Sequence, residues 1–406
     1  MNTAQFTDLC AWIAEAGLAG QSEAATLDGF CERALAVGLP LARANIVIDT
    51  LHPVYEGRAF VWKRKTKKTS LTEFGRGTVD VQRWENSPYY YLELSNEPVL
   101  RRRLTAETEK EFSVFPELRR EGMTDYLAIT NRFAADGIVG EMDCVYSSWA
   151  TDGPAGFSDA DAADLCRLMP LLALTLKAAS LARIAGTLVE TYLGRDAGHR
   201  VLAGRIARGV TDQIVAVLWF SDLRSYTRIS DSAAPEDIIP MLNAYAGAII
   251  SAIHDRGGDV LKLIGDGTLA IFPVEDRGEA CRAALAAAEA ARRAVAAVSM
   301  QRAQANLPMT DMYLGLHIGE VFYGNIGSED RLDFTVVGPA VNEVSRIASM
   351  CRSVDQPLLL SSAFATALGQ PNHRLVSVGR YALRGVARAQ DLFTLEELSN
   401  VDRGDC

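Results

Sequence analysis

The sequence predicts an α+β protein with two domains and a helical connector between them. The chain of 406 residues is long enough for two domains of ordinary size. In both halves, short runs of β-branched residues alternate with longer segments that have helical periodicity. Between the halves, apolar residues recur at the spacing expected of a helix that packs along one side. The expected boundaries are a first domain at 1–178, a linker at 179–210, a second domain at 211–398 and a tail at 399–406.

The composition indicates a globular protein that does not bind nucleic acid. Hydrophobic residues make up 49% and charged residues 23% of the chain, so a sizeable core can form. The formal net charge of −10 disfavours binding to nucleic acid or to an anionic membrane surface. An anionic substrate would therefore need local lysine, arginine or metal ions to offset the field of the whole protein.

Cysteine usage and hydropathy predict a cytoplasmic protein without a transmembrane segment. The seven cysteines are scattered and include no CxxC pair, which is typical of reduced thiols and argues against a zinc site. The first 18 residues contain Asp8 and Glu15 and lack the basic start of a secretory signal. The longest apolar stretch, 168–176, is far too short to span a bilayer.

The first domain is expected to be an α/β domain that ends in a hairpin and a capped helix. Ser158 should cap the helix that follows it, with Asp161 three residues further on. The basic run at 63–68 is interpreted as a solvated strand end or loop. The predicted helices lie at 6–17 and 24–37, the strands at 44–50 and 59–63, and the hairpin strands at 125–132 and 138–147.

The connector is predicted to be a helix from about 174 to 192. Leu174, Leu181, Ile184 and Leu188 follow one another at spacings of seven, three and four. This spacing fits the seam of a two-stranded coiled coil. A helix packed on its own domain would show the same short pattern, so the sequence leaves both interpretations open.

The second domain begins with a buried strand and continues as an alternation of strands and helices. Pro240 lies within its first long helix and should mark the first turn or bend the helix. The predicted strands are 214–220, 260–264, 268–272, 313–318, 321–323 and 334–337, and the predicted helices are 235–256, 276–300 and 339–351.

Two acidic residues lie at strand ends of this domain. Asp222 follows the strand 214–220, and Asp266 sits at the tip of the tight turn Gly265-Asp266-Gly267. An Asp-Gly turn alone needs no function, but a pair of carboxylates suits Mg²⁺, which binds one or two carboxylates together with phosphate oxygens of a substrate. Two such ions can activate an attacking hydroxyl and neutralise a leaving pyrophosphate.

Four segments, in this order, make the second domain similar to a known family. They are WFSDLRSYT, GGDVLKLIGDGTLAIF, LGLHIGEVFYGNIGSEDRLDFTVVG and PAVNEVSRIAS. Together they resemble the class III adenylate cyclase catalytic domain over nearly all of residues 213–395. The resemblance implies a ferredoxin-like βαββαβ fold. The first domain resembles a GAF-like sensor domain in its order of elements, most clearly in the closing segment GFSDADAADLCRLMPLLALTLK.

The resemblance implies a two-metal site and a phosphate-binding turn. Asp222 and Asp266 correspond to the metal-binding aspartates of the family, and the backbone carbonyl of Leu223 completes a metal shell. The cofactors implied are two Mg²⁺ or Mn²⁺ ions for each active site. The backbone amides around Tyr226 and Thr227 correspond to the turn that binds phosphate.

The resemblance also implies how the base is recognised. Lys262 occupies the position that reads a ring nitrogen of adenine, and Thr335 the position that reads its exocyclic amine, as in the class IIIb subgroup. A hydroxyl can accept a hydrogen bond from an amine. Asp333 is rejected for this role because it is off register with Gly338.

The catalytic roles implied by the resemblance fall on one helix. Asn342 and Arg346 are four residues apart and therefore share a helix face. In the family that asparagine orients the ribose and that arginine stabilises charge at the α-phosphate, a task that suits an arginine fixed on a helix. Either Arg384 or Arg388 would supply a further cation for the terminal phosphates.

Two positions complete the comparison with the family pattern. Tyr313 stands where many members have a basic residue. His317 is interpreted as a structural residue at a strand end.

These residues predict an adenylate cyclase that converts ATP to 3′,5′-cyclic AMP and pyrophosphate. The resemblance implies that each site takes its metal aspartates from one subunit and the remaining residues from another, so a head-to-tail homodimer is expected. A guanylate cyclase should have an acidic residue where Lys262 stands, and a catalytically silent nucleotide sensor should lack part of the residue set. The first domain is expected to regulate activity through an unknown intracellular ligand or protein.

Overall fold

The computed structural model describes residues 1–77, 81–134, 139–140, 142–369, 375–386 and 389–396. These residues form two compact units, Met1–Leu188 and Val189–Cys406. The predicted tail at 399–406 lies outside the described residues. Six cysteines in the described part of the chain are free thiols, as the scattered spacing predicted.

The N-terminal unit is built on a six-stranded sheet in which every neighbouring pair is antiparallel. The strand order is β3-β2-β1-β6-β5-β4. The strands are β1 (Arg43–Asp49), β2 (Tyr55–Lys63), β3 (Lys68–Gly75), β4 (Val99–Arg103), β5 (Asp125–Arg132) and β6 (Cys144–Thr151).

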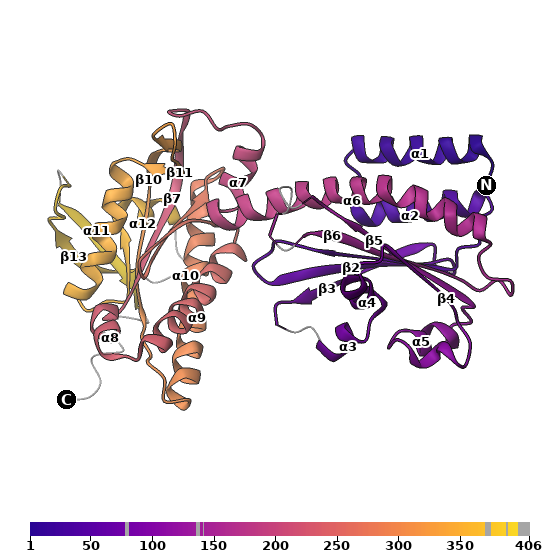
Figure 1. Cartoon of the computed structure of the whole chain (residues 1–406). Helices are drawn as coiled ribbons and strands as arrows, with labels where there is room; N and C mark the ends of the chain where they lie inside the picture. The colour runs from indigo at the N-terminus through magenta and orange to yellow at the C-terminus, as the bar shows by residue number, and fades with distance from the viewer. Residues whose placement is uncertain (78–80, 135–138, 141, 370–374, 387–388, 397–406) are drawn as a thin grey trace. The chain divides into compact units, whose positions relative to one another are not determined.

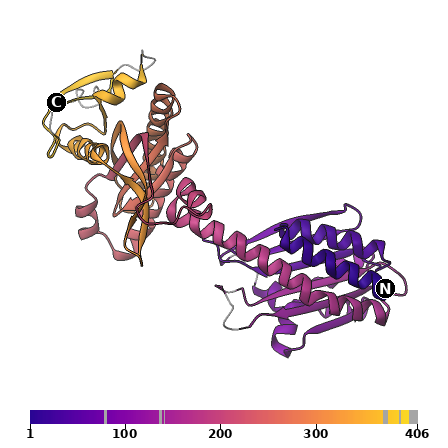
Figure 2. The same ribbon diagram turned by 90° about the horizontal axis from the view of Figure 1, so that it is seen from above.

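Helices cover both faces of this sheet (Figures 1 and 2). One face is covered by α1 (Thr3–Leu18), α2 (Glu23–Ala36) and the start of α6 (Asp159–Leu193), and their apolar side chains share one core with the strands. The other face packs against α3 (Val81–Glu85), α4 (Pro88–Ser95) and α5 (Phe115–Arg120), with the short 3₁₀ helix Thr108–Lys110 beside α5. The GAF-like assignment of this unit stays a prediction.

Several local predictions for this unit are confirmed. The hairpin pairs β5 with β6, although its second strand begins at Cys144, and residues 135–138 and 141 of its expected course lie outside the described residues. The Ser158 hydroxyl accepts a hydrogen bond from the Asp161 amide at 3.1 Å, and the Asp161 carboxylate accepts one from the Ser158 amide at 3.0 Å. This reciprocal pair is the predicted capping arrangement.

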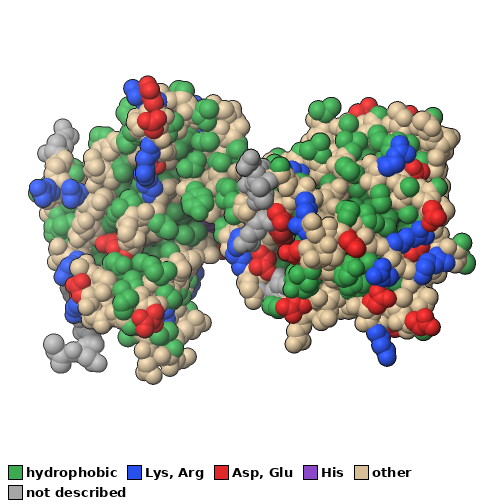
Figure 3. All heavy atoms as spheres, viewed as in Figure 1, with side chains coloured by type: hydrophobic (Ala, Val, Ile, Leu, Met, Phe, Trp, Pro, Cys, Tyr) green, Lys and Arg blue, Asp and Glu red, His purple; other side chains and the backbone are tan. Residues whose placement is uncertain are grey.

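The basic run at 63–68 forms the turn between β2 and β3, as predicted. Two of its charges are neutralised locally, because Lys63 pairs with Glu121 and Arg64 with Asp152. Figure 3 shows acidic and basic side chains intermixed over the visible face of this unit.

The helix α6 is much longer than the connector predicted from the sequence. Ile184 is buried in the core of the N-terminal unit, and Leu181 and Leu188 pack against that core, whereas the side chain of Leu174 is 60% exposed. The four residues therefore do not form one exposed seam, and the structure supports packing of the helix on its own unit.

α6 is also the one helix of the described chain that is long and apolar enough to cross a membrane. In its most apolar window 44% of the residues are buried within the protein, and core helices of soluble proteins commonly have this length and composition. The predicted absence of a membrane span therefore stays a prediction.

The C-terminal unit contains an eight-stranded sheet of order β13-β14-β12-β10-β7-β9-β8, with β11 paired to β10. Among the described strand pairs of this sheet, β10 and β12 are parallel and the others are antiparallel. The strands are β7 (Thr211–Leu223), β8 (Asp259–Ile264), β9 (Gly267–Pro273), β10 (Met312–Gly327), β11 (Leu332–Val337), β12 (Leu358–Ser361), β13 (Leu375–Tyr381) and β14 (Gln390–Leu395).

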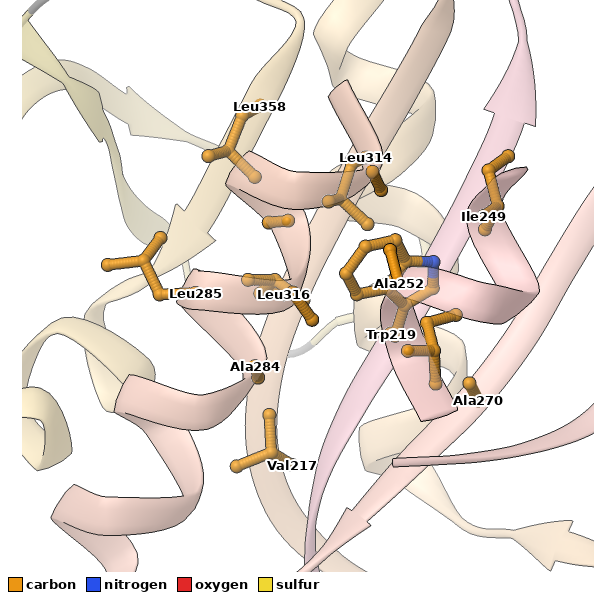
Figure 4. Close-up of a cluster of buried hydrophobic side chains, with 14 of the residues drawn as sticks. Val217, Trp219, Ile249, Ala252, Ala270, Ala284, Leu285, Leu314, Leu316 and Leu358 are labelled. Carbon is orange, nitrogen blue, oxygen red and sulfur yellow. The ribbon is translucent and has the colours of Figure 1, made fainter. Parts of the chain in front are cut away.

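In the described part of this unit, six helices accompany the sheet. They are α7 (Arg195–Leu202), α8 (Tyr226–Ser232), α9 (Pro235–His254), α10 (Arg277–Gln304), α11 (Pro339–Ser353) and α12 (Ser362–Leu368). The helices α9 and α10 cover one face, where Trp219 and Leu316 are fully buried among their apolar side chains (Figure 4). Each such side chain contributes about 1.5–3 kcal/mol by its removal from water.

The order β7-α9-β8-β9-α10-β10, with strands arranged β10-β7-β9-β8, is the predicted βαββαβ arrangement. One detail differs from the sequence prediction, and for Pro240 one of the two predicted alternatives is excluded. The segments 313–318 and 321–323 belong to one strand, β10, because residues 312–324 all pair with β7. Pro240 lies inside α9, beyond the first turn, so of the two alternatives the prediction that it bends the helix is the one left.

Candidate active site

The end of β7 and the β8–β9 turn bring the two predicted metal-binding carboxylates together. Ser221 of β7 pairs with Thr268 of β9, so the last two residues of β7, Asp222 and Leu223, lie beside the turn that precedes β9. The Asp266 carboxylate accepts a hydrogen bond from the backbone N–H of Leu223 at 3.2 Å. The turn is possible because Gly265 adopts a φ of +64°, which glycine tolerates without strain.

The carboxyl groups of Asp222 and Asp266 are close enough to share a proton. Partial desolvation and the neighbouring Asp266 carboxyl raise the pKa of Asp222 to about 6. Two adjacent carboxylates repel each other when both are ionised, and a divalent cation between them would remove this cost.

The donor set fits a magnesium-type ion that is shared with a substrate. Among the described residues no group of three or more histidine, cysteine or acidic side chains converges, so the protein does not provide a complete cage there. Mg²⁺ usually binds one or two carboxylates and fills its remaining positions with water and phosphate oxygens. Asp222, Asp266 and the backbone carbonyl of Leu223 are oxygen donors of the kind that Mg²⁺ prefers, and their role as metal ligands stays a prediction.

The backbone at Arg224, just after β7, is held by hydrogen bonds to Thr310 and Asp311. The amide of Arg224 donates to the carbonyl of Asp311 at 2.8 Å, and the Thr310 hydroxyl donates to the carbonyl of Arg224 at 2.5 Å. Ser225 then adopts a left-handed φ of +59°, and α8 begins at the next residue. Sequence reasoning missed Thr310, because its part in fixing this loop depends on a contact across 86 positions of the chain.

The predicted phosphate-binding residues open the short helix α8. Tyr226 is half-buried against the core below α9, and Thr227 is exposed. Nearby, the guanidinium carbon of Arg224 lies 5.6 Å from the centre of the Tyr313 ring. A cation therefore lies beside the position where the family often has a basic residue and this chain has Tyr313.

A β-bulge sets the direction of Lys262. Val260 pairs with Ala270, but Lys262 pairs with Leu269, so Leu261 is an extra residue on β8. Val260 and Ala270 face the core under α9 and α10, whereas Leu269 belongs to the core on the opposite face. The bulge thus turns Lys262 away from the α9–α10 face, as bulges commonly re-aim side chains.

Lys262 is paired with Asp333 of β11, the residue that sequence reasoning set aside. The contact arises because the sheet coils until β11 lies against β8, although the two strands are not hydrogen-bonded neighbours. Thr335 lies two residues along β11, hence on the same face of this strand as Asp333, and is buried. The structure therefore places both predicted base-reading residues on facing elements and adds a carboxylate beside Lys262.

The remaining predicted residues lie on and beside α11. Asn342 and Arg346 are exposed, and neither makes a hydrogen bond or ion pair with another residue in the described part of the chain. Arg384 is exposed in the loop after β13, and the preceding residue, Leu383, packs against Ile347 of α11. Arg388, the alternative to Arg384, lies outside the described residues.

His317 is buried in the middle of β10 and not at a strand end. Its Nδ1 shares a hydrogen bond of 2.8 Å with the hydroxyl of Ser361, and its Nε2 lies 3.5 Å from the Glu343 carboxylate. Burial lowers the pKa of His317 to about 4 and raises the pKa of Glu343. A neutral, enclosed imidazole of this kind fits the structural role that the sequence predicted.

Comparison with known proteins identifies the unit that contains this site. A family profile described as the adenylate and guanylate cyclase catalytic domain matches residues 210–397. Residues 210–397 are a class III cyclase catalytic domain. An adenylate cyclase from Anabaena cylindrica is 33% identical over 152 residues, which is 37% of this chain and 30% of that relative. The match thus spans about a third of the length of that curated protein.

Solved structures of both specificities resemble the cyclase domain. The adenylyl cyclase CyaB from P. aeruginosa has 23% identity and a TM-score of 0.42, with 46% of this chain and 95% of that chain covered. The guanylyl cyclase Cya2 has 28% identity and a TM-score of 0.41, with 48% and 97% covered. The matching family profile covers adenylate and guanylate cyclases alike, so it does not choose between ATP and GTP as the substrate of this cyclase domain.

Proposed function

We propose that the cyclase domain converts ATP to 3′,5′-cyclic AMP and pyrophosphate. The observation that supports adenine is the ammonium group of Lys262, turned by the bulge toward the face of β11 that contains Thr335. An ammonium only donates hydrogen bonds, and a ring nitrogen of adenine only accepts them. The Thr335 hydroxyl can accept from the exocyclic amine.

The chain's own residues bind and orient the substrate. Asp222, Asp266 and the Leu223 carbonyl would hold two Mg²⁺ or Mn²⁺ ions, which would supply activation of the ribose 3′-hydroxyl and neutralisation of the leaving pyrophosphate. Asn342 orients the ribose, and Arg346 donates to the α-phosphate oxygens as charge develops there. Catalysis of this kind depends on positioning and charge stabilisation and needs no covalent intermediate.

Tyr226, Thr227 and Arg384 complete the triphosphate site in this proposal. The backbone amides around Tyr226 and Thr227 face the phosphates from the end of β7, and the Arg384 guanidinium neutralises the terminal phosphates from the loop beside α11. These local donors are needed because the net charge of −10 repels an anionic substrate.

The site is completed by a second copy of the chain. Asn342 and Arg346 have no partner among the described residues, and both project from α11 on the side away from the sheet, where a nucleotide bound to another subunit can reach them. We expect a two-fold homodimer with two equivalent sites, each with metal ligands from one subunit and Lys262, Thr335, Asn342 and Arg346 from the other. The N-terminal unit regulates this pairing in the cytoplasm in response to an intracellular ligand or protein.

One observation favours guanylate cyclase as a second candidate function. The Asp333 carboxylate lies beside Lys262 and could accept hydrogen bonds from the ring N–H and the amine of guanine. In the adenylate cyclase proposal this carboxylate instead holds the lysine until the nucleotide binds.

Turnover of ATP and GTP by the purified chain with Mg²⁺ or Mn²⁺ decides between these functions. We expect kcat/KM to be at least about tenfold higher for ATP, since a site built around one hydrogen-bond pattern leaves the wrong base unpaired. The variant Lys262→Glu should lose activity on ATP and move the ratio toward GTP. A preference of the wild-type protein for GTP would refute the adenine assignment, and no turnover of either nucleotide would favour the silent sensor.

A further inference from the structure

The junction between α6 and α7 is fastened to the strand that contains Lys262. The Asp259 carboxylate, at the start of β8, accepts hydrogen bonds from the backbone amides of Arg195 at 3.0 Å and Asp196 at 3.1 Å. These are the first amides of α7, which have no partner within the helix. Asp259 is 6% exposed, so this contact is shielded from solvent.

Gly194 allows the close approach that this contact requires. It adopts a φ of +90°, and a Cβ atom added to it would lie 2.7 Å from the carbonyl oxygen of Val260 and 3.3 Å from the Asp259 carboxylate. Because glycine has no side chain, Gly194 lets the junction lie directly against the backbone of β8.

The fastened part of β8 is the part that forms the bulge. Val260, whose carbonyl meets Gly194, is the last regularly paired residue before the register shifts, and Leu261 is the extra residue. Leu261 is buried in the same cluster as Ala197 of α7. The α6–α7 junction thus touches β8 on both sides of the position where the chain changes face.

We propose that Asp259 is a positioning residue that holds the bulge of β8 in the form that aims Lys262 at the substrate base. Without the bulge, the alternation of side chains along β8 would turn Lys262 into the face covered by α9 and α10. The contact also ties α6, the helix that leaves the N-terminal unit, to the strand that precedes the metal-binding turn. A displacement of α6 would then change the direction of the Lys262 side chain. This inference depends on the adenine-reading role of Lys262 in the function proposed above.

The test compares Asp259→Ala with Asp276→Ala in the full-length chain. Asp276 is the matched control, because its carboxylate also caps a helix, accepting from the Glu279 amide at 2.7 Å at the start of α10, and no hydrogen bond or ion pair among the described residues joins it to β8. Both variants should lose a similar amount of thermal stability. Only Asp259→Ala should lower the ratio of kcat/KM for ATP over GTP, by about fivefold, mainly through a higher KM for ATP.

A second variant and a second readout keep the test decisive. Gly194→Ala alters no residue of β8. It should still reproduce the loss of selectivity for ATP over GTP, because the added methyl group pushes the junction away from Val260. Hydrogen exchange of the amides of residues 260–264 should rise in Asp259→Ala and Gly194→Ala but not in Asp276→Ala, and this readout needs no enzymatic activity.

The outcomes separate this inference from the proposed function. If the wild-type chain turns over neither nucleotide, the proposed function fails, while hydrogen exchange still tests the contact. If Asp259→Ala and Gly194→Ala reduce turnover of ATP and GTP by the same factor, with exchange at 260–264 unchanged, Asp259 is a structural cap and the inference is overturned.

Discussion

His317 is the residue whose charge depends most clearly on folding. It is enclosed between Ser361 and Glu343, and burial lowers its pKa to about 4. In the unfolded chain its pKa is the ordinary value of about 6.5. The unfolded state therefore binds the proton more tightly, and the stability that the neutral imidazole provides is complete above pH 6.5 and falls as the pH drops toward 4.

The variant His317→Asn should make unfolding less sensitive to acid. The asparagine amide can keep the hydrogen bond to Ser361 without titrating. Between pH 6.5 and 4, we expect the wild-type free energy of unfolding to fall by up to about 3 kcal/mol more than that of the variant. Urea denaturation at several pH values measures this difference. Equal slopes for the two proteins would show that folding does not lower the pKa of His317.

The residues of the site differ in how well the sequence predicted them. The meeting of Asp222 with Asp266 was predictable, because a strand end and a glycine-flanked turn are local features. The partner of Lys262 was not, since it depends on a one-residue bulge and on the coiling of the sheet that brings β11 against β8. Thr310 was missed for the same reason, as its contact with Arg224 is formed only by the fold.

Among the elements, α11 depends on a glycine in β10 for its position. A Cβ atom at Gly315 would lie 2.7 Å from the amide nitrogen of Ala348 and 2.8 Å from the carbonyl oxygen of Val344, both in the backbone of α11. Backbone atoms cannot turn aside as side chains do. The helix that contains Asn342 and Arg346 can therefore pack this close to β10 only because residue 315 has no side chain.

Replacing Gly315 by alanine should push α11 away from the sheet. We expect a loss of about 2 kcal/mol in the free energy of unfolding, as in other overpacked cores, and a lower kcat because Asn342 and Arg346 move with the helix. Urea denaturation and turnover of ATP at saturating substrate measure the two effects.

Gly247→Ala is the matched control for this prediction. Gly247 is exposed in α9, and a Cβ atom there meets no other atom within 4 Å. Alanine at this position should stabilise the helix by about 0.5–1 kcal/mol and leave kcat unchanged. If Gly315→Ala kept the wild-type kcat despite a loss of stability, the seating of α11 would not matter for catalysis.

The elements themselves were largely predictable from periodicity, with errors where tertiary structure decides. The βαββαβ order follows from alternating apolar runs and helical periods. The split of β10 into two strands was wrong, because Gly319 and Glu320 interrupt the apolar pattern but continue to pair with β7. The helix predicted after the Ser158 cap and the predicted connector helix 174–192 form one element, α6, which continues past Pro170.

At the scale of the whole molecule, the predicted site residues fall into two sets on one chain. Asp222, Leu223 and Asp266 converge at the end of β7, whereas Asn342 and Arg346 are exposed on α11 without partners in the described structure. The account therefore requires two copies of the chain for one complete site. Neither the cyclase domain's substrate nor its dimer follows from one chain alone, and both are tested by activity.

The most direct test mixes two inactive variants, Asp222→Ala and Arg346→Ala. Each homodimer lacks one set of residues at both sites, whereas a mixed dimer regains one intact site of its two. With random pairing, half of the dimers are mixed, so the mixture should recover about a quarter of the wild-type rate of cyclic AMP formation. No recovery in a mixture shown to contain mixed dimers, or full activity of either variant alone, would contradict a site shared between two subunits.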